Sequence, residues 1–198
     1  MEMQGSRRLA ISQQQAWDAL NDPEVLKQCI PGCDRVEATG DNQYAIGMAV
    51  RIGPVSARFT GKITLVDVRP PNSYTLVFEG QGGAAGFGKG TAKVNLAPPT
   101  EGAGCELTYA CTAQVGGKIA QVGQRLIDGV AKAMAEDFFK RFEAEMERRY
   151  PQAFVAEAAL APATPDPAAA EEAGKATPAW VWVLLGILVV AALILLLR

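Results

Sequence analysis

The stretch KIAQVGQRLIDGVAKAMAEDFFKRFEAEMERRY, residues 118–150, decides the fold that we expect. Its bulky apolar residues recur every three or four positions, which is the spacing of one face of an α-helix. The residues of this stripe are Ile119, Val122, Leu126, Val130, Met134, Phe138 and Phe142. The spacing predicts one long helix over residues 118–150, and the apolar face of that helix needs a partner surface.

A series of β-strand patterns upstream supplies that surface. Apolar and polar residues alternate with a period of two in residues 35–39, 43–52, 55–68, 73–80, 88–97 and 105–115. Short turns such as Asp41-Asn42 can join these strands, so we expect an antiparallel sheet. One face then collects apolar residues such as Ile46, Met48 and Ile63, while the opposite face carries charged residues such as Lys62 and Glu79.

The N-terminal part adds one strand and two short helices. Residues 2–11 alternate as a strand, Ser12 can cap a helix that carries Trp17 and Leu20, and Asp22-Pro23 can open a second helix that ends near Ile30. The expected fold class is therefore α+β, with a curved antiparallel sheet of about seven strands around one long C-terminal helix.

The segment GGAAGFGKGT, residues 82–91, has the glycine and lysine spacing of a phosphate-binding loop. Such a loop needs Ser or Thr directly after the lysine and a helix behind it. Here Gly90 follows Lys89, and the next residues alternate as a strand. The segment is therefore expected to join two strands, with Phe87 as its one bulky side chain.

The C-terminal 48 residues differ in composition from the rest. Residues 151–178 are rich in Ala, Pro and Glu, which predicts a flexible linker. Residues 179–197 are uncharged and apolar, and as a helix they would rise about 28 Å, enough to cross a bilayer. We therefore expect a domain at residues 1–150, a linker at 151–178 and a transmembrane anchor at 179–198. The N-terminus lacks the apolar segment of a signal peptide, so the predicted location is the cell membrane, with a single-pass C-terminal anchor and the domain facing the cytoplasm.

Charge and composition exclude several kinds of function. Residues 1–150 hold 17 basic and 17 acidic residues, so no basic field exists to attract nucleic acid. The chain has no histidine, which removes the commonest general base and the usual zinc ligand. The spacing of Cys29, Cys33, Cys105 and Cys111 favours free thiols over a metal or disulfide site. We expect neither a nucleic-acid partner nor a metal.

The residues alone leave the interior undecided between a solid core and a cavity. Small residues, Ala120, Gly123 and Gly129, accompany the first half of the long helix, whereas the second half offers Phe138 and Phe142. Space beside the first half would adjoin the glycine segment.

Several motifs, taken in order, resemble one known family. They are NDPEVLKQCIPGCDRVE, RIGPVSARFTGKITL, PPNSYTLVFEGQGGAAGFGKGTAKV and GGKIAQVGQRLID, and together they extend over nearly all of residues 1–150. On these motifs the chain resembles CoxG, a family of carbon monoxide dehydrogenase subunits. This family belongs to the helix-grip superfamily of START-like and polyketide cyclase-like (SRPBCC) domains.

The resemblance implies a non-enzymatic accessory of a carbon monoxide dehydrogenase-type molybdenum hydroxylase, one that is associated with the lipid bilayer. It also implies an apolar cavity that carries a quinone, expected to be menaquinone, with no covalently bound cofactor and no catalytic residue. The residues expected to contact this ligand are Leu26, Ile30, Val50, Val55, Ala57, Phe59, Leu76, Phe78, Phe87, Tyr109, Ile119, Val122, Gly123 and Leu126.

Two other functions remain open at this point. The chain could recruit or assemble the same class of enzyme at the membrane without carrying a ligand. It could also be a cyclase-like enzyme, which would require a paired acid and base inside the cavity.

Overall fold

The computed structural model describes residues 1–100 and 102–160, which form one seven-stranded sheet, four α-helices and two short 3-10 helices. In chain order the elements are β1 (Glu2–Leu9), α1 (Gln13–Leu20), α2 (Pro23–Cys29), β2 (Cys33–Gly40), β3 (Gln43–Ile52), β4 (Val55–Arg69), β5 (Ser73–Gln81), η1 (Gly83–Ala85), β6 (Phe87–Ala97), β7 (Cys105–Gly116), η2 (Lys118–Val122), α3 (Gln124–Arg149) and α4 (Pro151–Leu160).

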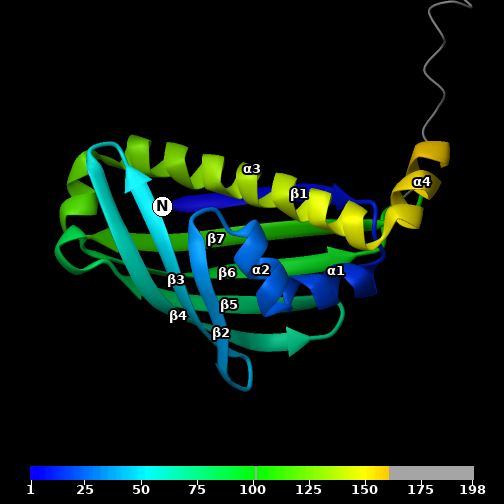
Figure 1. Ribbon diagram of the computed structural model, residues 1–198, viewed down its shortest axis with the longest axis horizontal. Helices are drawn as coiled ribbons and strands as arrows, with labels where there is room; N and C mark the ends of the chain where they lie inside the picture. The colour runs from blue at the N-terminus through cyan, green and yellow to red at the C-terminus, as the bar shows by residue number, and fades with distance from the viewer. Residues whose placement is uncertain (101, 161–198) are drawn as a thin grey trace, which may run out of the picture. The chain divides into compact units, whose positions relative to one another are not determined.

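The sheet is antiparallel throughout, with the strand order β1-β7-β6-β5-β4-β3-β2. Strands β2 to β7 form a meander, and β1 joins it at the β7 edge. Their register aligns apolar residues on one face, for example Leu65 opposite Leu76 and Val94 opposite Tyr109. Figure 1 shows the sheet curving around α3, which lies along this apolar face. The predicted α+β fold, with a curved antiparallel sheet and a long C-terminal helix, is confirmed.

The two short helices begin at the predicted caps. Ser12 and Gln15 form a capping box, in which the Gln15 amide donates to the Ser12 hydroxyl and the Ser12 amide donates to the Gln15 side chain. The Asp22 carboxylate accepts from the amide of Glu24 at 2.9 Å and starts α2. Figure 1 shows α1 and α2 beside the C-terminal half of α3. These helices therefore cover one end of the sheet.

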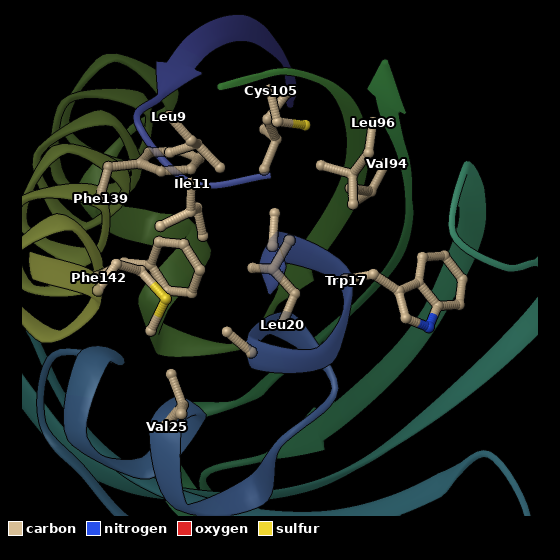
Figure 2. Packing of buried hydrophobic residues seen from close by; sticks show 14 of the residues in the cluster. Leu9, Ile11, Trp17, Leu20, Val25, Val94, Leu96, Cys105, Phe139 and Phe142 are labelled. Atoms are coloured by element: carbon tan, nitrogen blue, oxygen red, sulfur yellow. The ribbon is translucent and has the colours of Figure 1, made fainter. Parts of the chain in front are cut away.

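The main hydrophobic core lies at that end. Figure 2 shows Phe139 and Phe142 from α3 facing residues of β1, α1 and the segment between them, such as Ile11 and Leu20. Phe142 and Ile11 have no exposed surface. Side chains from the sheet and from α1, α2 and α3 thus pack together without solvent access, as expected for a closed core.

The long helix differs from its prediction in both its start and its buried stripe. A continuous helix over 118–150 is wrong, because Gly123 has φ +95° and separates η2 from α3. This break changes the helical phase, but Ile119 and Val122 still share a hydrophobic cluster with Ile127 and Val130 of α3. Ile127 is buried in place of Leu126, which is 41% exposed. Farther along, Phe142 is buried as predicted.

A buried carboxylate that the sequence pattern did not indicate joins α3 to α2. Glu145 is only 8% exposed and accepts hydrogen bonds from Arg148 and Arg149, both at 2.6 Å. Arg149 also donates to Asp22, the cap of α2, at 3.0 Å. Hydrogen bonds from Arg148, and then from Arg149, outweigh burial and lower the pKa of Glu145 from 4.5 to about 2.

This shift predicts a pH-dependent contribution to stability. Because the pKa of Glu145 is lower in the folded chain than in the unfolded chain, its contribution is complete above pH 4.5 and is lost as the pH falls towards 2. Glu145→Gln should lower the free energy of unfolding at pH 7 by about 1–3 kcal/mol. Thermal unfolding from pH 7 to pH 2 should then show a weaker pH dependence for the variant. Parallel curves for the two proteins would contradict this assignment.

The structured part continues beyond residue 150, the predicted end of the domain. The first ten residues of the predicted linker form α4, and Ala153 and Phe154 pack against the main core. Residues 1–160 make one compact unit. The remaining linker and the transmembrane anchor predicted at 179–198 lie outside the described residues. Within residues 1–100 and 102–160, none of the helices combines the length and apolar character needed to span a bilayer.

Candidate functional site: an apolar cavity over a row of glycines

The apolar face of the sheet has two unlike halves. Towards α1 and α2 the side chains are closely packed, with Leu65 7% exposed, Tyr74 5% and Leu96 3%. Towards the other end, residues of the same face are only half-buried: Ile46, Met48, Val50, Phe59, Ile63 and Phe78. Large apolar side chains in a solid core would be almost fully buried. This half of the face therefore borders open space.

That space is a cavity of about 260 Å³ between the sheet and η2. Its lining comes from β3, β4, β5, β6, β7 and η2 and consists of Ile46, Met48, Val50, Phe59, Gly61, Lys62, Ile63, Phe78, Glu79, Gly80, Phe87, Gly88, Val115 and Ile119. Lys62 and Glu79 are register partners that alternate with Ile63 and Phe78, so their side chains belong to the other face of the sheet. The residues that face the cavity are thus apolar.

Three glycines in register create part of the space. Gly61 lies opposite Gly80, and Gly80 lies opposite Gly88, so adjacent positions of β4, β5 and β6 carry no side chain. We call these three residues the glycine row. A Cβ atom at Gly88 would meet nothing within 4 Å, whereas a Cβ atom at Gly61 would collide with the backbone oxygen of Glu79. Gly88 therefore adjoins the void, while Gly61 also allows two strands to approach closely.

Only the first half of the glycine segment, residues 82–91, is a loop. It contains η1, and β6 begins at Phe87, so Gly88 and Gly90 are strand residues. The predicted connection between two strands is confirmed. The loop packs on the end of β7, just before η2, through Gly86, which has φ +120° and lies so close to Gly116 that a Cβ atom would collide with the carbonyl oxygen of Gly116. Both segments thus meet beside the cavity.

Five of the residues predicted to contact a ligand lie in the cavity lining. They are Val50, Phe59, Phe78, Phe87 and Ile119, which come from five different elements. Phe87 is at the edge: it is 46% exposed, and its register partner Gln81 lies on the face of the sheet that also carries Glu79. The structure thus brings together residues that are up to 69 positions apart in the sequence.

The other predicted contact residues lie elsewhere. Leu76 and Tyr109 pack against the main core, where Tyr109 stacks on Phe139 at 5.6 Å between ring centroids. Val122 joins a small cluster with Ile52 and Ile127. The remaining positions are outside the lining: Leu26 and Ile30 at α2, Val55 and Ala57 at the start of β4, Gly123 at the helix break, and Leu126 on the surface.

Several lining residues were absent from the predicted set. Ile46, Met48 and Ile63 had been placed on the apolar face by alternation, but alternation does not tell how far along a strand the packed region ends. Val115 and the glycine row were not singled out either. Their signal is visible only after the strands are aligned, because it is the register that brings Gly61, Gly80 and Gly88 together.

The lining described here is suited to binding by shape and apolar contact. Lys62 and Glu79 are its ionisable members, and both belong to the other face of the sheet. Within residues 1–100 and 102–160, no group of His, Cys, Asp and Glu side chains is arranged to hold a metal ion. An apolar ligand would find shelter from water here.

Solved structures share this fold. A conserved protein from Geobacillus kaustophilus is 34% identical, with a TM-score of 0.70 over 75% of this chain and 96% of that chain. The ZhuI aromatase/cyclase from Streptomyces sp. R1128 is 13% identical, with a TM-score of 0.53 over 75% of this chain and 94% of that one. A Mycobacterium smegmatis protein, Ms6760, is 16% identical with a TM-score of 0.56, covering 75% of this chain and 92% of the other. The two more distant matches support the fold alone.

The sequence itself carries a family signature. Among curated proteins, none matches this chain significantly. Residues 5–147, however, match CoxG, a family described by its role as a carbon monoxide dehydrogenase subunit. This match begins within β1, ends in the last turn of α3 and includes every residue that lines the cavity. Together with the shared helix-grip fold, it shows that the chain belongs to the CoxG family.

Proposed function

We propose that this chain is a membrane-anchored accessory protein of a carbon monoxide dehydrogenase-type molybdenum hydroxylase, and that it carries a quinone between that enzyme and the respiratory chain. The quinone type that we propose is menaquinone. The chain itself performs no catalysis in this scheme. Family membership supports the link to the enzyme, and the cavity supports the carriage of an apolar ligand.

One observation carries the proposal: large apolar side chains of the sheet are half-buried around a cavity of about 260 Å³. Leaving such surface without a partner forgoes about 25 cal/mol for each Å² that could have been buried. An apolar ligand recovers this energy when it fills the space. The volume is just below the usual range of about 300–1,000 Å³ for small-molecule pockets. It suits a quinone ring system, with the isoprenoid tail extending from the mouth.

A quinone brings its own redox chemistry, which the apolar residues of the cavity do not supply. A quinone accepts two electrons and two protons to become a quinol, so the protein that holds it needs no metal and no histidine of its own. Its tail is difficult to remove from a bilayer, because each methylene group exposed to water costs about 0.8 kcal/mol. A soluble enzyme therefore benefits from a protein that holds the quinone ring at the membrane, where the tail can stay in the bilayer.

Anchoring belongs to the same proposal. Residues 179–197 contain no charged residue and have the length of a bilayer span, and Trp180 and Trp182 stand where interfacial aromatic residues are common. The domain would face the cytoplasm, held near the membrane by the residues that follow α4. Tethering of this kind raises the local concentration to about the millimolar range.

The test compares electron transfer with and without this chain. Membranes supplied with the partner enzyme and its substrate should consume oxygen at least about tenfold more slowly when the chain is absent, because the enzyme then lacks its route to the quinone pool. Reduction of a soluble dye by the same enzyme should be unchanged.

Each contrary outcome has a distinct meaning. Unchanged oxygen consumption without the chain would refute quinone carriage. Loss of dye reduction as well would show that the enzyme itself is incomplete, which is the result expected of an assembly factor. A chain shortened after residue 178 serves as the control for anchoring, since it retains every residue of the cavity lining.

A further inference from the structure

Three chain connections meet at the end of the domain that holds the cavity. Figure 1 shows the β3–β4 turn, the loop before β6 and the segment between β7 and α3 at the same end of the sheet. We call residues 51–55, 81–88 and 114–127 together the cavity tip. The tip includes the lining residues Phe87, Gly88, Val115 and Ile119, so the tip and the cavity are continuous.

The cavity tip exposes apolar side chains. Phe87 is 46% exposed and Leu126 is 41% exposed, although both are large and apolar. Leu126 rests on the β3–β4 turn, since a Cβ atom at Gly53 would lie 2.9 Å from its Cδ2 atom. Pro54 in the same turn is also exposed. The chain thus presents apolar groups to solvent where the ligand would enter.

The charged residues of the cavity tip are all basic. The three segments contain Arg51, Lys118 and Arg125 and not a single Asp or Glu. All three cations are exposed, and none of them forms an ion pair with another of the residues that the structure describes. Elsewhere on the domain, basic and acidic residues are mixed: Arg58 and Arg141 pair with carboxylates, whereas Lys132 and Lys140 form no ion pair with a described residue.

We propose that the cavity tip docks on the surface of an anionic lipid bilayer, so that the mouth of the cavity faces the acyl chains. Exposed Leu and Phe side chains with flanking cations are the features that bind proteins to such interfaces. Each cation near an anionic surface strengthens docking by about fivefold. This inference rests on the proposed function, because it provides the route by which an apolar ligand passes between membrane and cavity without crossing water.

The experiment measures amide hydrogen exchange of the full chain in the presence of two kinds of lipid vesicle. One kind contains equal parts of phosphatidylglycerol and phosphatidylcholine, and the other contains phosphatidylcholine alone. In the anionic vesicles, residues 81–88 and 116–127 should exchange about fivefold more slowly, and high salt should remove the difference. The double substitution Lys118→Glu and Arg125→Glu should abolish the effect. The matched control, Lys132→Glu with Lys140→Glu, makes the same charge change on exposed residues of α3 outside the tip and should retain it.

Several results would overturn the inference. Equal exchange in both vesicles would show that the tip does not recognise anionic lipid. Protection that requires the partner enzyme would make the tip a protein interface instead. Quinone titration of the same samples distinguishes this failure from that of the proposed function: quinone binding without tip protection refutes docking alone, whereas tip protection without quinone binding refutes carriage alone.

Discussion

Gly88→Leu is expected to weaken the binding of a short-tailed menaquinone by about 10- to 100-fold, which corresponds to about 1.4–2.8 kcal/mol. The reason is the position of Gly88 in the glycine row, where a new Cβ atom meets open space and the rest of the leucine would occupy the cavity. Stability should not fall, because leucine is better suited than glycine to a strand and no neighbour must move. Ligand titration and thermal unfolding of the same protein provide the two measurements.

The matched control for this change is Gly129→Leu. Gly129 lies on an exposed part of α3, its Cβ atom would also meet nothing within 4 Å, and it does not line the cavity. This variant should bind the quinone normally. If Gly88→Leu binds as tightly as the unmodified chain, the ligand does not occupy the cavity that we describe.

Phe142→Ala should lower the free energy of unfolding by about 3–5 kcal/mol. The side chain of Phe142 has no exposed surface and packs in the main core beside Ile11 and Leu20 (Figure 2), so its removal leaves a void that the surrounding helices cannot fill. Chemical denaturation followed by circular dichroism measures the loss. Bound quinone should not restore it, because the void would form in the packed half of the domain.

A second phenylalanine makes this prediction specific. Phe78 lies on the same face of the sheet but lines the cavity and is already half-buried. Phe78→Ala should therefore cost at most about 1–2 kcal/mol, since few packing contacts are lost. Equal losses for the two variants would mean that the sheet has one uniform core and that the division into packed and open halves is wrong.

Local sequence signals were sufficient for most of the fold. The strand over residues 43–52 was predicted with both of its ends, because alternation continues up to the Gly53-Pro54 turn. The caps Ser12 and Asp22 were also confirmed, since each side chain can satisfy a free helix amide within a few residues. Features determined by neighbours in sequence are therefore accessible without a structure.

Features that depend on distant segments were not predicted. The apolar residues on both sides of Gly123 keep the three- or four-residue spacing of a continuous helix, so the pattern did not reveal the break. It therefore could not show that Ile127 would replace Leu126 in the core. The composition of residues 151–160 is typical of a linker, yet these residues form α4, which contacts the main core. Glu145 is buried where Arg149 links it to Asp22, the cap of α2, which lies 127 positions away from Arg149 in the sequence. Each outcome results from tertiary contacts that override local preference.

The glycine row also suggests how proteins of this architecture could diversify. A side chain added at Gly88 enters open space, and one at Gly80 would meet its nearest neighbours at ordinary van der Waals distance, 3.6 Å or more. Gly61 cannot be replaced in this way, because the Cβ atom of any larger residue would collide with the backbone of the adjacent strand. Exchanging alanine, serine or valine at the two adjustable positions would shorten the accommodated molecule step by step while the hydrogen-bonded framework stayed the same. Ligand preference could thus change through single substitutions, well before the fold itself had to change.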